Sequence, residues 1–276
     1  MNLVWGLLIT VAATAIAVAA MLLVRRTAPE GSRFTDGDRA SGVFGVLATG
    51  FSVLLGFIVF LAFTSYDQSR TGAETEALMV VQQVETAQFF PDDTAGELTG
   101  ELVCYGRSVV NDEWEQMRSG TLGDRINPWG VELFRTLQVV EPMTAAEQSA
   151  YDKWLEQTSA RDEARLDRVH GAVGVIPTQL WIVLFFIAAV IFVYMLFFAD
   201  RGEGAVTQAV LMGSVVAVIA TLLLLLHALD NPFNEGIGGL DPVAMERSLR
   251  LVDEALGAVD GQVAIPCNSE GVQVAP

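Results

Sequence analysis

The stretch FSVLLGFIVFLAFTSYDQSR, residues 51–70, runs from an uncharged apolar segment into one that carries Asp67 and Arg70. No Pro or Gly follows Gly56 within it to end a helix. Its first part is apolar enough for a bilayer, whereas its second part belongs in water. The stretch therefore predicts one helix that leaves a membrane and continues outside it.

Around it the sequence has uncharged windows, each long enough to cross about 30 Å of hydrocarbon at about 1.5 Å per residue. They cover residues 2–24, 41–64, 178–199 and 205–229. The apolar fraction of 52% is high for a soluble protein. The expected fold class is therefore all-α: a polytopic membrane protein with four transmembrane helices and an extramembrane helical bundle inserted between the second and third spans.

Charge and turn signals divide the chain into four parts. We expect a first transmembrane hairpin over 1–64, an acidic extramembrane helical bundle over 65–177, a second transmembrane hairpin over 178–229, and an extramembrane tail over 230–276. Within the bundle, helices are expected near 93–119, 128–140 and 144–170, the last opened by a capping box of Thr144 and Glu147. The tail should carry one amphipathic helix over 242–259.

The first window also has a small-x-small site at 17–19, as a cleaved signal peptide would. However, no basic residue precedes it, and its apolar run continues to Arg25 and Arg26, so we expect a retained helix. Those two arginines predict cytoplasmic short loops. Both termini, the bundle and the tail should then be extracytoplasmic, in a bacterial inner membrane that the chain crosses several times. Arg161, Arg165 and Arg168 near the third span argue for the opposite orientation.

The net charge of −17 limits the partners of the protein. The bundle holds twenty acidic residues against nine basic ones, and phosphate contacts need Lys and Arg, so nucleic acid is excluded. The acids alternate with arginines and apolar residues at helical spacing, which is typical of solvated faces. We expect no cofactor and no metal. Two isolated histidines and the lack of catalytic motifs indicate that the protein is not an enzyme.

The two cysteines, Cys104 and Cys267, lie on one side of a four-span chain. If that side is oxidising, they are candidates for a disulfide. Two unrelated buried thiols are the alternative.

Three arginines of the bundle share one helix face, because they stand at positions i, i+4 and i+7. We consider ion pairs across the bundle with Glu113 or Glu115, against local pairing with Asp162 and Asp167. The residues of the first interpretation are Glu113, Glu115, Arg161, Arg165 and Arg168.

The middles of the four windows contain no Asp, Glu, Lys or Arg, which disfavours pumps and ion-coupled transporters. Small residues four apart favour close helix packing, within one chain or between chains. On the second span, one polar and three apolar residues share a face: Thr49, Val53, Phe57 and Phe60. A ring of such faces would gate ions by dewetting. Contact with lipid or with neighbouring helices is the alternative.

Several motifs recur in an order that resembles the bestrophin-like family, bacterial four-span membrane proteins with no established activity. They are VLLGFIVFLAF (53–63), YGRSVVNDEW (105–114), SARDEARLDR (159–168), VIPTQLWIVL (175–184) and LDNPFNEG (229–236). The resemblance covers most of residues 1–243. More distantly, the family is similar to bestrophins, pentameric anion channels whose second helix forms an apolar neck.

This resemblance implies a neck on the second span. Phe57 matches a neck aromatic, Val53 stands where another aromatic would be, and Gly50 replaces a Pro. Bestrophins keep their termini and helical block in the cytoplasm, whereas Arg25 and Arg26 predict the opposite orientation here.

The expected function is that of an oligomeric integral membrane protein, a candidate ion channel with an apolar constriction on the second helix. Its partners would be the lipid bilayer, further copies of itself, and a membrane or extracytoplasmic protein. The alternative is a non-conducting membrane scaffold or accessory subunit that binds a partner through its acidic block and tail.

Overall fold

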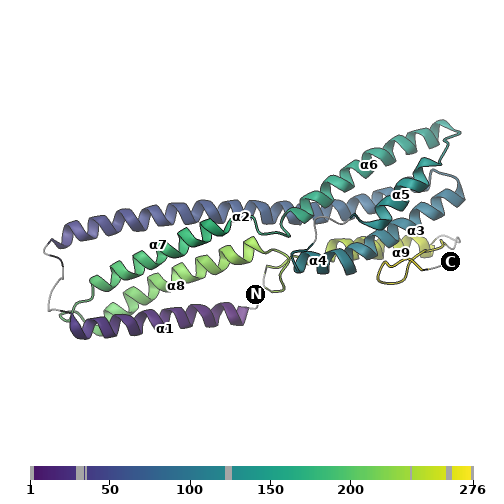
Figure 1. Cartoon of the computed structure of the whole chain (residues 1–276). Helices are drawn as coiled ribbons and strands as arrows, with labels where there is room; N and C mark the ends of the chain where they lie inside the picture. The colour runs from purple at the N-terminus through teal and green to yellow at the C-terminus, as the bar shows by residue number, and fades with distance from the viewer. Residues whose placement is uncertain are drawn as a thin grey trace. The chain divides into compact units, whose positions relative to one another are not determined.

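The computed structural model describes residues 3–28, 34, 36–121, 126–236, 238–258 and 263–274. Within these ranges the chain is helical, apart from turns and one isolated β-bridge between Cys267 and Gln273 (Figure 1). It forms two compact units: residues 1–65 with 174–239, and residues 66–173 with 240–276. The expected ends of the first span at Asn2 and of the tail helix at Val259 lie outside the described residues.

The first unit is built from apolar helices. It contains α1 (Leu3–Thr27), the first part of α2 (Gly37–Ala87), α7 (Thr178–Phe197) and α8 (Ala205–Asp230). In the described part of the chain, these helices are the ones long and apolar enough to cross a membrane. The uncharged windows of the sequence account for their positions.

The core of this first unit joins α2 to α7 and α8. Phe51, Leu55, Ile58 and Ala62 recur at three- and four-residue spacing on α2 and pack against residues such as Leu184. Between α8 and α1, Gly213 allows close approach, because a Cβ there would lie 3.3 Å from side-chain methyls of Thr14 and Val18. The ends of α1 and α7 are also tied together. Arg25 donates hydrogen bonds to the carbonyls of Asp200 and Arg201, at 3.0 and 3.1 Å.

The second unit is a bundle of more polar helices. It contains the rest of α2, α3 (Asp92–Ser108), a π-helical segment (Val109–Glu113), α4 (Trp114–Arg118), α5 (Pro128–Gln138), α6 (Ala145–His170) and α9 (Val243–Ala258). Its core includes large buried side chains on several helices, among them Leu102, Trp114, Leu133 and Trp154.

Local chemistry sets several helix ends in this unit. Thr144 caps α6 by accepting the Glu147 amide at 3.1 Å, and the Glu147 carboxylate accepts the amide of Met143. Asn127 caps α5 through the amide of Trp129, and Pro128 fills the first turn of that helix.

The helix expected near 93–119 is present from Asp92 to Arg118, but it contains a π-helical segment, Val109–Glu113. The π-helical segment separates α3 from α4 and inserts about one extra residue into the helical register. As a result Val109, Glu113 and Trp114 are all buried. Within this segment Asn111 donates a hydrogen bond to the distant carbonyl of Ser269 at 3.3 Å, and no local sequence pattern indicates the insertion.

Candidate functional site

The predicted lining residues lie on the face of α2 that points away from the core of the first unit. Successive helical residues are about 100° apart, so Thr49, Val53, Phe57 and Phe60 fall opposite Phe51, Leu55, Ile58 and Ala62. In the single chain Thr49 is exposed, and the exposed fractions of Val53, Phe57 and Phe60 are 68, 61 and 63%. This face is free for lipid, another chain or a pore.

Small residues lie beside these aromatics. A Cβ added to Gly42, Gly45, Gly50 or Gly56 would meet no atom of the described residues within 4 Å. The nearby hydroxyls of Ser52 and Thr64 donate to carbonyls of their own helix, at 2.9 and 3.0 Å. The face thus offers room for a close-packed neighbour, and these two hydroxyls are already satisfied.

In the second unit, a buried ion network joins α2, the π-helical segment and α6. Arg168 is fully buried and donates to the carboxylates of Glu76 and Glu113. Arg165 donates to Glu113 at 3.1 and 3.2 Å, and Asn127 donates to the same carboxylate at 2.9 Å. Two carboxylates therefore face two guanidinium groups inside the bundle.

Other residues of the predicted ion-pair set lie elsewhere. Arg161 is buried, donates to Gln83 at 2.9 Å, and stands over the ring of Tyr105 at 4.7 Å. It also lies 3.5 Å from Asp162, as the local-pairing interpretation expected. Glu115 faces Arg118 at 3.9 Å instead of the arginines of α6. The π-helical segment explains this, because it turns Glu113 inward and leaves Glu115 exposed.

Burial and charge together shift the pKa values in this network. Burial alone would raise the pKa of Glu113, but Arg168 and Arg165 outweigh it and hold that pKa below its usual range. Burial, and then the nearby Glu76 carboxylate, raises the pKa of Tyr105, whose hydroxyl donates to Glu76 at 2.6 Å. Glu113 is therefore ionised at neutral pH, whereas Tyr105 is neutral.

The tail is fastened along α3. Cys104 and Cys267 form a disulfide with an S–S distance of 2.03 Å. Arg107 donates to the carbonyl of Asn268 at 3.2 Å, and Trp129 donates to that of Gly271 at 2.6 Å. We call residues 263–274 the tail strap.

Glycines allow the tail strap to lie this close. A Cβ on Gly100 would be 2.4 Å from the carbonyl oxygen of Ala264. Gly271 has a φ of 80°, and a Cβ there would be 2.4 Å from the amide nitrogen of Ser108. Side chains at either position would push the strap away from α3.

Sequence reasoning missed Glu76, Glu101, Tyr105 and Asn127. Glu101 is buried on α3, accepts a hydrogen bond from Thr136 at 2.9 Å, and has a second carboxylate oxygen without a hydrogen-bond partner among the described residues. The helical period of the apolar residues was the available signal, since it places Glu76 and Glu101 on inward faces. Within the described ranges, no three His, Cys, Asp or Glu side chains are placed to hold a metal ion.

Comparison with known proteins gives one family and one fold. A family model described as "Bestrophin-like domain" matches residues 11–238. None of the curated proteins compared with the chain matches it. A crystal structure of a bacterial bestrophin homologue from Klebsiella pneumoniae is similar, with a TM-score of 0.62 and 14% identity, over 93% of this chain and 99% of that chain. A mutant form of that homologue gives a TM-score of 0.63 and 14% identity, over 93% and 100%.

Proposed function

This chain belongs to the bestrophin-like family, and on that premise we propose that it assembles in the inner membrane into a homo-oligomeric ion channel lined by α2. The helices α1, α2, α7 and α8 cross the bilayer, and the second unit is the extramembrane block. The single observation that carries the proposal is the exposed face of α2, which places Val53, Phe57 and Phe60 away from the core of their own unit.

The proposed gate is an apolar constriction. Val53 and Phe57 are one helical turn apart, about 6 Å along the axis, and Phe60 lies about 5 Å further on. Copies of this face around a shared axis would make a constriction about 10 Å long, narrow enough to expel water when closed. The glycines beside it let neighbouring chains approach closely.

We propose that the channel prefers cations. The net charge of the chain is −17, and the second unit carries exposed carboxylates such as that of Asp67. Acidic residues repeated around an axis attract cations and repel anions. This preference differs from that of bestrophin anion channels.

The proposed orientation puts both termini and the second unit outside the cytoplasm. Two observations support it: Arg25 and Arg26 lie in the last turn of α1, and short cytoplasmic loops carry an excess of Lys and Arg. The disulfide between Cys104 and Cys267 supports the same orientation, because disulfides persist in oxidising compartments.

Ion flux into liposomes tests the proposed channel. We expect wild-type protein to carry a flux of monovalent cations that exceeds the anion flux, and Phe57→Ala to raise it several-fold by widening the constriction. Phe186→Ala is the matched control, because Phe186 on α7 is 66% exposed and should contact lipid. It should leave the flux unchanged.

A lack of flux in all three proteins would overturn the channel. It would instead favour a non-conducting scaffold that binds a partner through the acidic second unit. If Phe57→Ala and Phe186→Ala changed the ion flux equally, the protein would still be a channel, but α2 would not be its gate.

A further inference from the structure

A cavity of about 620 Å³ lies within the first unit, between α1, α7 and α8. Apolar side chains line it almost completely, including Ile9, Phe185, Met195 and Ile219, and the polar exceptions are His227 and the indole N–H of Trp181. None of its lining residues comes from α2. The cavity is therefore separate from the proposed pore face.

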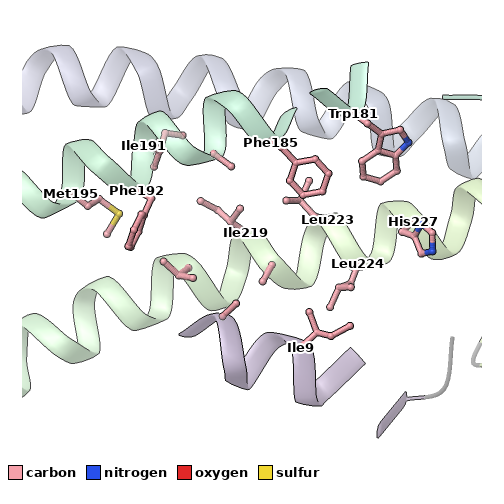
Figure 2. A pocket seen from close by; sticks show the side chains of 14 residues that line it. Ile9, Trp181, Phe185, Ile191, Phe192, Met195, Ile219, Leu223, Leu224 and His227 are labelled. Carbon is pink, nitrogen blue, oxygen red and sulfur yellow. The ribbon is translucent and has the colours of Figure 1, made fainter. Parts of the chain in front are cut away.

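The cavity extends along α7. Figure 2 shows Met195 at one end and Trp181 with His227 at the other, with Phe185, Ile219 and Leu223 between them. Trp181 and Met195 are fourteen residues apart on one helix, which corresponds to about 21 Å. This exceeds half of the roughly 30 Å hydrocarbon thickness of a bilayer.

The lining favours one kind of occupant. A hydrocarbon chain would meet apolar side chains of α1, α7 and α8, and it would reach polar groups only at the end formed by Trp181 and His227.

Polar contacts surround the end of the cavity at His227. Trp181 donates to Asp230 at 3.4 Å, and its ring stands edge-on to that of His227 at 6.3 Å. The amide nitrogen of Asn231 lies 3.5 Å from Nδ1 of His227. Because an amide nitrogen only donates, this contact favours the tautomer with the proton on Nε2. His227 is exposed and lines the cavity, so its imidazole is a polar group that an acceptor oxygen could use there.

The end at His227 also matches the edge of the hydrocarbon layer. His227 is three residues from the end of α8, and Trp181 is in the first turn of α7. Trp side chains favour the membrane–water interface. An amphiphile that lies along the cavity would therefore have its polar group at the depth where lipid ester and phosphate oxygens occur.

We propose that this cavity is a phospholipid site, which holds one acyl chain from Met195 to Trp181 and an ester or phosphate oxygen against Nε2 of His227. Lipid tails and the lining are equally apolar, so binding depends on shape and on this hydrogen bond. The site would be occupied whether or not the protein conducts ions.

Native mass spectrometry of the full chain, exchanged from the membrane into detergent, tests the site. We expect a phospholipid retained on each wild-type chain. Ala13→Phe, which places a ring in the cavity, should reduce retention at least tenfold. Ala12→Phe is the matched control, because Ala12 is the exposed preceding residue outside the lining, and it should retain the lipid. If Ala13→Phe does not fold, Ala220→Phe fills the cavity from α8.

A second pair of variants tests the polar end. His227→Phe should weaken retention several-fold, and His227→Gln should restore it, because its amide supplies an N–H. Equal retention by the Ala13 and Ala12 variants would overturn the proposal. So would a wild-type chain that retains no lipid, or one that retains a molecule other than a phospholipid. Ion flux plays no part in these measurements.

Discussion

Arg168 carries a positive charge at a position with no access to water. Two carboxylates balance this charge. Glu76 and Glu113 each accept from its guanidinium group, and all three side chains are at most 4% exposed. Burial disfavours the charged form of Arg168, but the two carboxylates outweigh it and raise its pKa. The network joins α2 to α6 through Glu76 and Arg168, and removing one partner of such a buried group leaves an uncompensated charge.

We therefore predict that Arg168→Leu destabilises the protein by about 3–5 kcal/mol, because it leaves two buried carboxylates without their common partner. Thermal unfolding in detergent measures this. Arg70→Ala is the control, since Arg70 and Glu74 form a half-exposed pair, and it should change stability by less than about 1 kcal/mol. Equal losses in the two variants would contradict the role of the network.

Glu101 should make the stability of the protein depend on pH, with a sign opposite to that of Glu113. Burial raises the pKa of Glu101 from 4.5 to about 7, the hydrogen bond from Thr136 lowers it, and Glu97 and Glu132 raise it further. The folded state thus binds this proton more tightly than the unfolded state. The resulting stabilisation is complete below about pH 4.5 and is lost as the pH rises towards 7.

Between pH 5 and pH 8, the loss attributable to Glu101 should be on the order of 2 kcal/mol. We expect Glu101→Gln to remove this part of the pH dependence of the melting temperature. The exposed Glu97 gives a control, because Glu97→Gln should keep most of it. An unchanged pH profile in Glu101→Gln would show that the carboxyl is not the titrating group.

At the residue scale, sequence reasoning predicted contacts that follow from helix periodicity. The spacing of Arg161, Arg165 and Arg168 placed them on one face, and Glu113 was among the expected partners. Glu76 was missed because its ionic partner lies more than ninety residues away. Glu115, the other partner considered, faces Arg118 instead, since the π-helical segment changes the register in a way that no sequence pattern indicates.

At the element scale, the close crossing of α2 and α6 depends on Gly72. A Cβ there would be 2.5 Å from the backbone nitrogen of Arg168 and 2.7 Å from the carbonyl oxygen of Ala164. The Gly171 amide donates to Ser69 at 3.0 Å nearby. Close backbone contact at this crossing thus positions the guanidinium of Arg168 against Glu76.

The tail strap is the element that the disulfide controls. The disulfide joins residues 163 positions apart, and closing a loop of that length contributes about 5 kcal/mol in the chain-entropy model. We predict that Cys104→Ser lowers stability by up to this amount and releases the strap from α3. The melting temperature of wild type under reducing conditions should fall similarly.

The same variant reports the orientation of the chain. Cys104→Ser leaves Cys267 as a free thiol, and a membrane-impermeant maleimide should label it on intact cells. Wild type should be labelled only after reduction. Labelling of Cys104→Ser that requires permeabilised cells would place the second unit in the cytoplasm and contradict the proposed orientation.

The helices were largely predictable, because uncharged windows, prolines and caps are local signals. The bundle helices expected near 128–140 and 144–170 correspond to α5 at Pro128–Gln138 and α6 at Ala145–His170. Residues 263–274 carry no helical periodicity in the sequence. The path of this tail strap along α3 depends on close contacts of Gly100 and Gly271 with backbone atoms that are distant in sequence. A local sequence pattern does not predict such contacts.

At the scale of the whole molecule, the proposed function rests on two features, the exposed face of α2 and the strongly acidic composition of the chain. The apolar residues would form the barrier, whereas Asp67 and the acidic second unit would set the preference for cations. Sequence periodicity alone placed Thr49, Val53, Phe57 and Phe60 on one face. Periodicity did not indicate what covers that face, because the same apolar pattern is expected whether the face contacts lipid, another protein chain or a pore.

The structure of the assembled protein in lipid nanodiscs, solved by electron cryo-microscopy, would show whether α2 lines a pore. We expect a ring of three or more chains in which Phe57 of every chain faces the common axis. A monomer, a dimer, or a ring in which Phe57 contacts lipid would contradict it.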